Sequence, residues 1–553
     1  MASEDRRVPR WQNTLLIGLL VGAGFGAAVA SWLPGGEVAP TQPAVHPVHR
    51  SAPPPGSGPR VYYDAVHGAR HLHDRDNRRY RTDYHTIGGW FRFLESLRSA
   101  GYDVVPESHA CFDRETLDAF DVVVIGEQTY HARFMSRAEV EALRGWVEDG
   151  GGLLLTVEHT NAHYMGDVFN RLAAPFPVRA RFDSICDTDT SHRSARDWVR
   201  LTPAGEHPVT EGVATVHFYN GCSLDTEHGV LMSSAGSWSD TYAVRDKPVH
   251  NGDKRRQADE LTGPLAGVAA FDYGSGRVVV LGDHNGLSNI ELYVADHHRL
   301  GLNAIRWLAQ AGPEQVEWDY ADGIDLMVHT GAGSAFSLHQ KTAMGGFRTV
   351  YAQLTREPHL RPWAHDTLQA GHELMLLAAP TEAYSEAEQA VLAEHLASDR
   401  PLIWLATQAS VASPAGQLLQ DVLQVDIVVG DSLELGFKRP LNVHGPPELT
   451  SGIFRQFVPP ATPSVRVDGL TPVVQLRAGG WHVEEHKWRK KDVLIDLISR
   501  RENVWVVAPF DLFDDHHLPG MFGEKGDVVR QQTAELMLRL VKVAASDPVV
   551  LVD

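Results

Sequence analysis

Apolar runs alternate with amphipathic segments along most of the chain. Three early runs, at 61–66, 121–126 and 153–157, read VYYDAV, DVVVIG and LLLTV. Between the first two, apolar residues recur at helical spacing over 90–97, and Gly101 ends that pattern. Continuous apolar strands that alternate with amphipathic helices are typical of a parallel sheet covered by helices on both faces. The pattern therefore predicts an α/β fold.

The same order of elements returns in the second half of the chain. Ser136 and Glu139 form a capping-box sequence that opens a helix, and Ser385 and Glu388 repeat it. The flanking runs also recur: 121–126 is matched by 373–380, 153–157 by 401–407, and 277–289 by 504–515. The matched order predicts two homologous tandem α/β domains, at 61–312 and 322–545. The alternative is a chance likeness between generic strand–helix units.

The N-terminus predicts a membrane location. Residues 14–33 are 20 uncharged, mostly apolar residues, long enough to cross a bilayer as one helix. Arginines precede this stretch and no basic cluster follows it closely, so residues 1–13 should be cytoplasmic, 14–34 a signal anchor, and the bulk of the chain extracytoplasmic or periplasmic. Residues 35–60 are rich in proline and predict an extended stalk. The alternative is secretion after signal cleavage near Ala30.

Composition narrows the choice of partners. The chain of 553 residues carries 70 acidic against 50 basic side chains, a formal net charge of −20. Such a surface argues against nucleic acid, because phosphate binding needs concentrated lysine and arginine. The three cysteines, Cys111, Cys186 and Cys222, form no CxxC motif, which excludes a structural zinc knot and a disulfide scaffold. Whether Cys186 and Cys222 pair with each other stays open.

Several motifs of the first half resemble a known family. They are Asp64 to Gly68 after the first strand, the strand at 120–126, the segment EVEALRGWVEDGGGLLLTVE at 139–158, HPVTEGV at 207–213, and the closing GRVVVLGDHNGLSN. Together they resemble the flavodoxin-like, class I glutamine-amidotransferase-like domains of DUF4350 and GldG/IFT52-type proteins. The resemblance covers most of 61–312 and, weakly, 322–545. It implies two tandem flavodoxin-like domains, and it suggests an accessory of an envelope or ABC-type transport system.

The resemblance does not carry over the chemistry of that family. In amidotransferases the strand that corresponds to 153–157 runs into a sharp turn that holds a nucleophilic cysteine. Here that turn reads Glu158-His159-Thr160, and the second copy reads Thr407-Gln408-Ala409. Because the thiolate performs the reaction, glutamine hydrolysis is not expected. A non-catalytic role follows, in which the domains bind a ligand such as a glycan, bind an envelope partner, or scaffold an assembly.

Histidines and carboxylates of the first domain gather where its strands should end. Carboxyl ends of parallel strands converge on one crevice, so residues far apart in sequence are expected to share a site. The catalytic candidates are Asp64, His67, Glu158, His159, Asp283 and His284. Their counterparts in the second domain are mostly absent, which assigns any chemistry to the first.

The alternative function is that of a metal-dependent hydrolase. If the turn after the fourth strand enters a helix, His159 and His163 lie on one face, and Asp64 and Asp283 add carboxylates. Zinc held by such a set would generate a hydroxide nucleophile near neutral pH. No HExxH signature supports this alternative. No cofactor is therefore expected in the favoured, non-catalytic interpretation, and a divalent ion such as zinc belongs to the alternative.

Overall fold

The computed structural model describes most of residues 61–312 and 322–545. It describes the following residues: 58–64, 66–67, 89–107, 111–126, 135–188, 196–241, 252–310, 323–334, 350–351, 354–355, 357, 360–434, 442–450, 461–484, 487–508 and 524–545. The predicted cytoplasmic segment 1–13, the anchor 14–34 and nearly all of the stalk lie outside these residues. Within them, no helix is long and apolar enough to cross a membrane.

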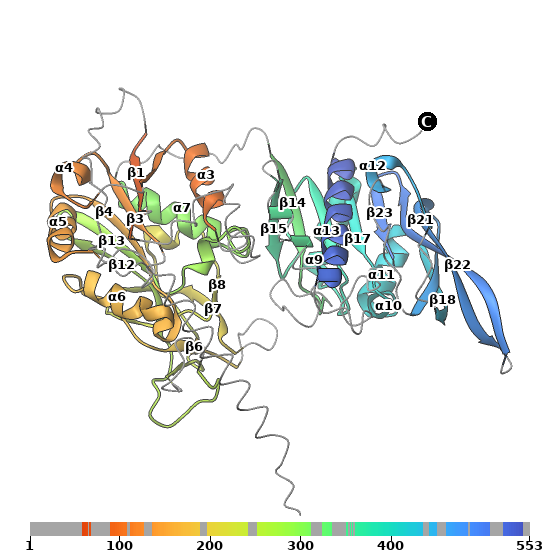
Figure 1. The fold of residues 1–553 in the computed structure, drawn as a ribbon, viewed down its shortest axis with the longest axis horizontal. Coiled ribbons are helices and arrows are strands. Elements are labelled where there is room, and N and C mark those ends of the chain that lie inside the picture. The colour runs from red at the N-terminus through yellow and green to blue at the C-terminus, as the bar shows by residue number, and fades with distance from the viewer. Residues whose placement is uncertain are drawn as a thin grey trace, which may run out of the picture. The chain divides into compact units, whose positions relative to one another are not determined.

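The first half forms an α/β domain (Figure 1). Its main elements are β1 (Arg60–Asp64), α3 (Phe91–Ser99), β2 (Asp103–Glu107), α4 (Arg114–Leu117), β3 (Val122–Ile125), α5 (Arg137–Glu148), β4 (Gly152–Thr156), the 3-10 helix η2 (His159–Tyr164) and α6 (Met165–Leu172). Short strands follow: β5 (Arg179–Ala180), β6 (Ser184–Cys186), β7 (Trp198–Pro203), β8 (Val216–Tyr219), β9 (Leu224–Asp225), β10 (Gly229–Met232) and β11 (Trp238–Asp240). The domain closes with β12 (Ala266–Tyr273), β13 (Gly276–Leu281), the 3-10 helix η5 (Asn285–Leu287) and α7 (His297–Leu308).

The strand order of this domain is that of a flavodoxin-like sheet. The main sheet runs β2-β1-β3-β4-β13-β12-β10-β7-β8, and the first five strands are parallel to one another. Numbered along the chain, those five strands have the order 2-1-3-4-5, one of the two common doubly wound arrangements. In such sheets ligands bind outside the carboxyl ends of the strands, so this edge is where a site is expected.

The parallel strands are buried on both faces, as their continuous apolar sequence predicts. Alternate residues of β3 enter different cores: Val122 and Val124 pack in the core that contains α3 and α7, whereas Val123 and Ile125 pack in the core that contains α5 and α6. Successive side chains of a strand point to opposite faces, so helices cover the sheet on both sides. The capping box of α5 is confirmed, with Ser136 and Glu139 each accepting the other's backbone N–H.

The second half repeats this order of elements. They are β14 (Ile324–His329), β15 (Leu360–His365), β16 (Leu374–Ala378), α9 (Glu386–Ala397), β17 (Leu402–Leu405), α10 (Gln408–Val411), α11 (Pro414–Leu423), β18 (Asp426–Glu434) and β19 (Asn442–His444). After them come α12 (Pro447–Thr450), β20 (Ala461–Asp468), β21 (Thr471–Glu484), β22 (Lys487–Arg501), β23 (Val504–Val507) and α13 (Glu524–Ala545). The capping box at the start of α9, formed by Ser385 and Glu388, is confirmed as well.

The two sheets correspond strand by strand over their parallel part. The second sheet begins β15-β14-β16-β17-β23-β22, which matches β2-β1-β3-β4-β13-β12 in order. Its first five strands are parallel, and β22 joins them antiparallel, as β12 does in the first sheet. The prediction of parallel sheets is therefore correct only for the first five strands of each sheet. Both sheets are mixed, because each last parallel strand pairs with an antiparallel neighbour. In the second sheet that neighbour, β22, pairs antiparallel with β21 and parallel with β20.

Candidate functional site

The first candidate group lies at the carboxyl ends of β4 and β13, which are neighbours in the sheet. Glu158 follows β4 and occupies the N-cap position of η2, where its Oε1 accepts the backbone N–H of His159 at 2.9 Å. Asp283 and His284 follow β13. Because β4 and β13 are parallel and in register through Thr156 and Leu281, both connecting turns leave the sheet at the same edge.

A glycine allows the turn that brings Asp283 to Glu158. The Gly282 carbonyl accepts the N–H of Cys222, and its N–H donates to the carbonyl of Gly267. A Cβ at position 282 would lie 2.3 Å from the Cys222 carbonyl oxygen, so this close backbone approach requires glycine. Asp283 is then fixed by three donors: the N–H of Tyr219 and both the backbone N–H and the side-chain amide of Asn285.

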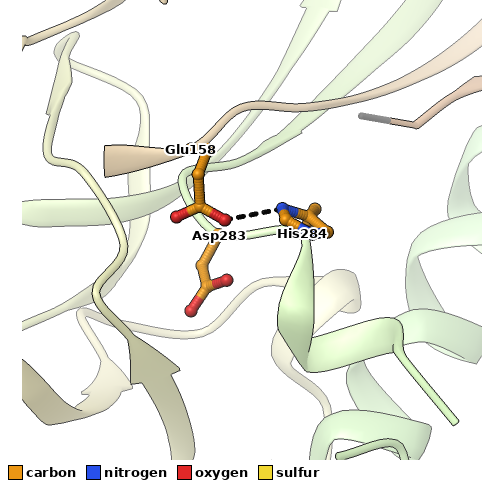
Figure 2. Close-up of side chains that lie close together, drawn as sticks. All are labelled: Glu158, Asp283 and His284. Atoms are coloured by element: carbon orange, nitrogen blue, oxygen red, sulfur yellow. Dashed lines mark ion pairs between the residues drawn. The ribbon is translucent and has the colours of Figure 1, made fainter. Parts of the chain in front are cut away.

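Glu158, Asp283 and His284 each offer a ligand atom, and these atoms all lie within 4.8 Å of one another. Figure 2 shows the three side chains side by side, with the ion pair between Glu158 and His284 marked. In that pair His284 Nδ1 lies 2.7 Å from Glu158 Oε2. All three residues are buried, with 5%, 1% and 1% of their surface exposed. Among the described residues, no other group of three histidine, cysteine or acidic side chains meets this distance criterion.

The two carboxyl groups of this cluster have different pKa values, because burial and neighbouring charges act on them to different extents. Burial raises the pKa of Asp283, the neighbouring Glu158 raises it further, and the result is about 7. Burial also acts to raise the pKa of Glu158, but the charges of His284 and His159 and their hydrogen bonds outweigh it, so this pKa lies below its usual range. Glu158 is therefore ionised at neutral pH, whereas Asp283 is poised to hold or release a proton.

A second buried group lies at the carboxyl end of β1. Oδ1 of Asp64 accepts the backbone N–H groups of Val66 and His67 at 3.0 and 3.2 Å. Nδ1 of His67 lies 3.2 Å from Asp64 Oδ2, and its Nε2 lies 3.2 Å from Oε1 of Glu139, the capping-box residue of α5. Burial alone would lower the pKa of His67, but the two carboxylates raise it to about 9. This group ties the turn after β1 to the start of α5.

The structure thus divides the candidates that the sequence placed in one site. Two strands, β3 and β4, separate β1 from β13. At about 4.8 Å per strand, Asp64 and Asp283 start from backbones about 14 Å apart. Asp64 and His67 accordingly pair with Glu139, and Glu158 and Asp283 join His284.

The predicted pair of histidines has a different local geometry from the one expected. The segment His159–Tyr164 is a 3-10 helix, not an α-helix. With three residues per turn, positions four apart do not lie on one face, so the geometric reason for pairing His159 with His163 does not apply. Nε2 of His159 lies 3.9 Å from Glu158 Oε1, and its Nδ1 lies 2.7 Å from Thr160 Oγ1. The side chain of His163 lies outside the described residues.

Two residues of these groups were not among the sequence candidates. Asn285 donates its side-chain amide to Glu158 at 3.1 Å and to Asp283 at 2.9 Å, and so bridges the two carboxylates. Asn285 directly follows Asp283 and His284 in the sequence, and this position could have indicated that it belongs to the same group. Glu139 carried only the capping-box signal, which gives no information on its contact with His67 because the two are 72 positions apart in the chain.

The three cysteines are free thiols in the structure, so Cys186 and Cys222 do not form a disulfide there. Both are fully buried, whereas Cys111 is half-buried. Burial raises the pKa of the Cys222 and Cys186 thiols, and nearby carboxylates raise both further. A thiol that resists ionisation is a poor nucleophile.

This geometry belongs to a region with a recognised sequence family. Residues 88–305 match DUF4350, a domain of unknown function. The match begins just before α3 and ends within α7, so it includes Glu158, Asp283 and His284 but excludes β1 and the whole second domain. No curated protein sequence matches the chain.

Several solved structures resemble about half of the chain. The N-terminal domain of mmIFT52 covers 46% of this chain and 100% of its own, at 13% identity and a TM-score of 0.33. A ThuA-like protein from Bacteroides uniformis covers 48% of this chain and 95% of its own, at 16% identity and a TM-score of 0.29. A cytoplasmic protein from Salmonella typhimurium LT2 covers 45% of this chain and 99% of its own, at 14% identity and a TM-score of 0.28.

Proposed function

We propose that this chain is a membrane-anchored envelope protein whose α/β domains bind a ligand, in particular a glycan, or a protein partner, without hydrolysing glutamine. The observation that supports it best is the turn after β4. Its N-cap residue is the carboxylate Glu158, and the N-cap residue of the corresponding α10 is Thr407. Neither turn carries a thiol, and the two buried cysteines have raised pKa values. The resemblance to GldG-type proteins adds a role as an accessory of an envelope or ABC-type transport system.

An assay of glutamine hydrolysis tests the negative part of this proposal. The full chain, purified in detergent, is expected to release no ammonia from glutamine above the rate without protein, because no thiol occupies the turn after β4 and burial keeps the Cys186 and Cys222 thiols protonated. Cys111→Ser and Cys222→Ser are the matched variants. Hydrolysis by the wild type that disappears in one of them would overturn the proposal.

The membrane part rests on residues 14–34 and is tested by fractionation. We expect the full chain to sediment with membranes and to be released by detergent, and a chain without residues 14–34 to lack this behaviour. The intact mass of the purified protein distinguishes the two predicted fates of the segment. A mass that corresponds to a start near residue 31 shows signal cleavage and contradicts the anchor.

The grouping of Glu158, Asp283 and His284 favours a second candidate, a metal-dependent hydrolase. Imidazole nitrogen and carboxylate oxygen are both zinc ligands, and the three ligand atoms are close enough to surround one ion. A bound zinc would supply an activated water. In this reading Asn285 would orient the two carboxylates through its side-chain amide, as its present hydrogen bonds do.

Metal analysis separates the two candidates. A hydrolase of this type is expected to contain one zinc per chain, to lose it in Glu158→Gln and His284→Ala, and to keep it in His228→Ala, an exposed histidine of the same domain. Hydrolysis of p-nitrophenyl acetate should fall together with the zinc content. A zinc-free wild type whose melting curve is unchanged by chelator would contradict the hydrolase and leave the binding function.

A further inference from the structure

Two aromatic side chains are exposed on η2 and on the segment that is hydrogen-bonded to it. Among the described residues, Tyr164 and Phe182 are the only aromatic members of the exposed large hydrophobic set, at 53% and 45% of their surface. Tyr164 is the last residue of η2, which begins directly after Glu158. Phe182 lies in the bend between β5 and β6. Tyr164 therefore lies on the segment that leaves the carboxyl edge of the first sheet, and the bend with Phe182 contacts that segment through Asp183.

The two segments that carry these rings are fastened together. The side chain of Asn170 on α6 donates to the carbonyl of Ala180 at 3.0 Å and accepts the N–H of Ala180 at 2.9 Å. The N–H of Thr160 donates to the carbonyl of Asp183 at 2.8 Å. The bend that contains Phe182 is thus held at both of its ends against η2 and α6, and the ring has a defined place.

Gly166 provides the surface on which the Phe182 ring lies. A Cβ at position 166 would be 2.7 and 2.9 Å from two carbons of that ring and 3.2 Å from Oδ1 of Asn161. Only glycine lets the ring approach the first turn of α6 this closely. The Phe182 ring and the Asn161 amide therefore both lie close to Gly166, two residues after Tyr164.

Tyr164 keeps its exposed position at a cost in backbone energy. Its φ of +61° and ψ of +19° are left-handed, a conformation that costs a bulky residue roughly 1 kcal/mol or more. Asparagine or glycine would adopt it with less strain. With 53% of its surface exposed, burial in the core contributes little to the choice of tyrosine at this position.

A fixed polar pair lies beside Gly166, the residue that the Phe182 ring approaches. Asn161 donates its side-chain amide to Asp167 Oδ2 at 2.9 Å and accepts the N–H of Asp167 with its Oδ1, also at 2.9 Å. Both residues are half-buried, so their positions are restricted while part of each remains accessible. The combination offers apolar ring faces beside a carboxylate that can accept hydrogen bonds from hydroxyl groups.

We propose that Tyr164 and Phe182, with Asn161 and Asp167, form a platform that binds a pyranose ring of a neutral glycan. The inference rests on the proposed ligand-binding function and states which part of the chain contacts the ligand. A sugar ring has an apolar C–H face that stacks on aromatic rings and an equatorial rim of hydroxyls that needs polar partners. The carboxylate of Asp167 disfavours an anionic sugar. Two rings are far smaller than the about 800 Å² per partner of a stable protein interface, which favours a glycan over a protein.

The corresponding turn of the second domain carries no aromatic residue. The turn and helices after β17 read TQASVASPAGQ over 407–417, without an aromatic residue. The turn after the fourth parallel strand thus lacks a thiol in both domains, and only in the first does it lead to an aromatic residue, Tyr164. Any glycan bound through stacking is therefore assigned to the first domain.

Titration calorimetry on the full chain tests the platform. The protein is purified in a detergent without a sugar headgroup and titrated with neutral tetrasaccharides of glucose, mannose, galactose and N-acetylglucosamine. For the sugar that binds best, Tyr164→Asn and Phe182→Ser should each weaken binding by about 10-fold or more, because aromatic anchors dominate such contacts. Tyr164→Phe should stay within about 3-fold, since it keeps the ring. Leu261→Ala, an equally exposed position of the same domain, should have no effect.

The variants are chosen so that misfolding cannot imitate the expected result. Asparagine tolerates the left-handed backbone at position 164, so Tyr164→Asn should melt at or above the wild-type temperature. Binding that is unchanged in Tyr164→Asn and Phe182→Ser would overturn the platform and leave glycan binding intact. If the wild type binds none of the four sugars, the glycan part of the proposed function fails and the platform fails with it.

Discussion

The two α/β domains place their parallel strands in the same order, yet they differ at nearly every position where chemistry is expected. Backbone hydrogen bonds align them: the N–H of Val157 donates to the Leu281 carbonyl, and the N–H of Ala406 donates to the Val507 carbonyl. By this alignment Glu158, Asp283 and His284 correspond to Thr407, Pro509 and Phe510. The whole buried cluster is thus specific to the first domain. The comparison teaches that the fold is retained by its apolar strands and capped helices, while the strand ends are free to diverge.

One polar contact is shared by both domains, although its charge state differs. In the first, His67 contacts Glu139 of the capping box, and in the second, His329 at the end of β14 contacts Glu388 of the equivalent box, with Nε2 and Oε1 3.6 Å apart. In the first domain Asp64 is a second carboxylate within 3.2 Å of the ring, and the pKa of His67 is raised to about 9. In the second domain the charges of Glu388 and Asp366 also act to raise the pKa of His329, but more weakly than burial lowers it. Burial dominates at His329 and lowers its pKa to about 4. At neutral pH the histidine of this contact is therefore charged in the first domain, which makes an ion pair, and uncharged in the second.

The largest expected effect is the loss of stability when the ion pair of the first domain is broken. Glutamine also serves in a capping box, so Glu139→Gln removes the charge and keeps the cap. Both Glu139 and His67 are buried, and Asp64 still faces the charged ring in this variant, so the cost should lie at the lower end of the range for breaking a buried ion pair, about 3 kcal/mol. Glu388→Gln is the matched control in the second domain and should cost less than about 1 kcal/mol, because its histidine is neutral at pH 7. Urea unfolding, followed by amide exchange in each domain, measures the loss of unfolding free energy in each variant. Equal losses in the two variants would contradict the difference in charge between His67 and His329.

A second effect is an opposite dependence of the two domains on pH. The folded pKa of His67, about 9, lies above its unfolded value of 6.5, so its contribution is complete below pH 6.5 and is lost as the pH rises through 9. The folded pKa of His329, about 4, lies below 6.5, so its contribution is complete above pH 6.5 and is lost as the pH falls towards 4. Each contribution is up to about 3 kcal/mol.

Unfolding free energies between pH 4 and pH 10 check this prediction. His67→Asn should flatten the alkaline loss in the first domain, and His329→Asn should flatten the acid loss in the second. Two results would show that the assigned charge states are wrong. The first is a contribution of His67 to the unfolding free energy that falls as the pH is lowered, and the second is a contribution of His329 that falls as the pH is raised.

The smallest effect concerns thiol reactivity, which reports on the first domain alone because the second contains no cysteine. Cys186 and Cys222 are fully buried with raised pKa values, and Cys111 is half-buried. We expect one thiol per chain, Cys111, to react with a disulfide reagent under native conditions and all three to react in denaturant. Rapid native labelling of Cys222 would contradict the inert thiols on which the absence of glutamine hydrolysis depends.

The sequence predicted the repeated framework well, because strong local signals specify it. The apolar runs became β3, β4, β16 and β17 within two residues of their expected limits, and both capping boxes formed with reciprocal hydrogen bonds. Fully buried strands require continuous apolar sequence, and a capped helix requires its two residues at fixed spacing. These signals do not depend on distant parts of the chain.

The antiparallel strands and the grouping of the site could not be predicted in the same way. Strands β5 and β6 are two and three residues long, too short for a periodic pattern. Converging strand ends correctly suggested a polar edge, but the order of strands decides which ends are neighbours. Placing β3 and β4 between β1 and β13 separated Asp64 from Asp283. A long-range pairing of this kind leaves no trace in a single sequence.

Amide exchange of the full chain, with and without the best-binding tetrasaccharide, tests the central claim most directly: that ligand binding belongs to the carboxyl edge of the first sheet. We predict slower exchange in peptides that span 158–184, which contain both exposed rings, and unchanged exchange in peptides that span 407–417 of the second domain. Protection confined to the second domain, or spread equally over both, would contradict the claim.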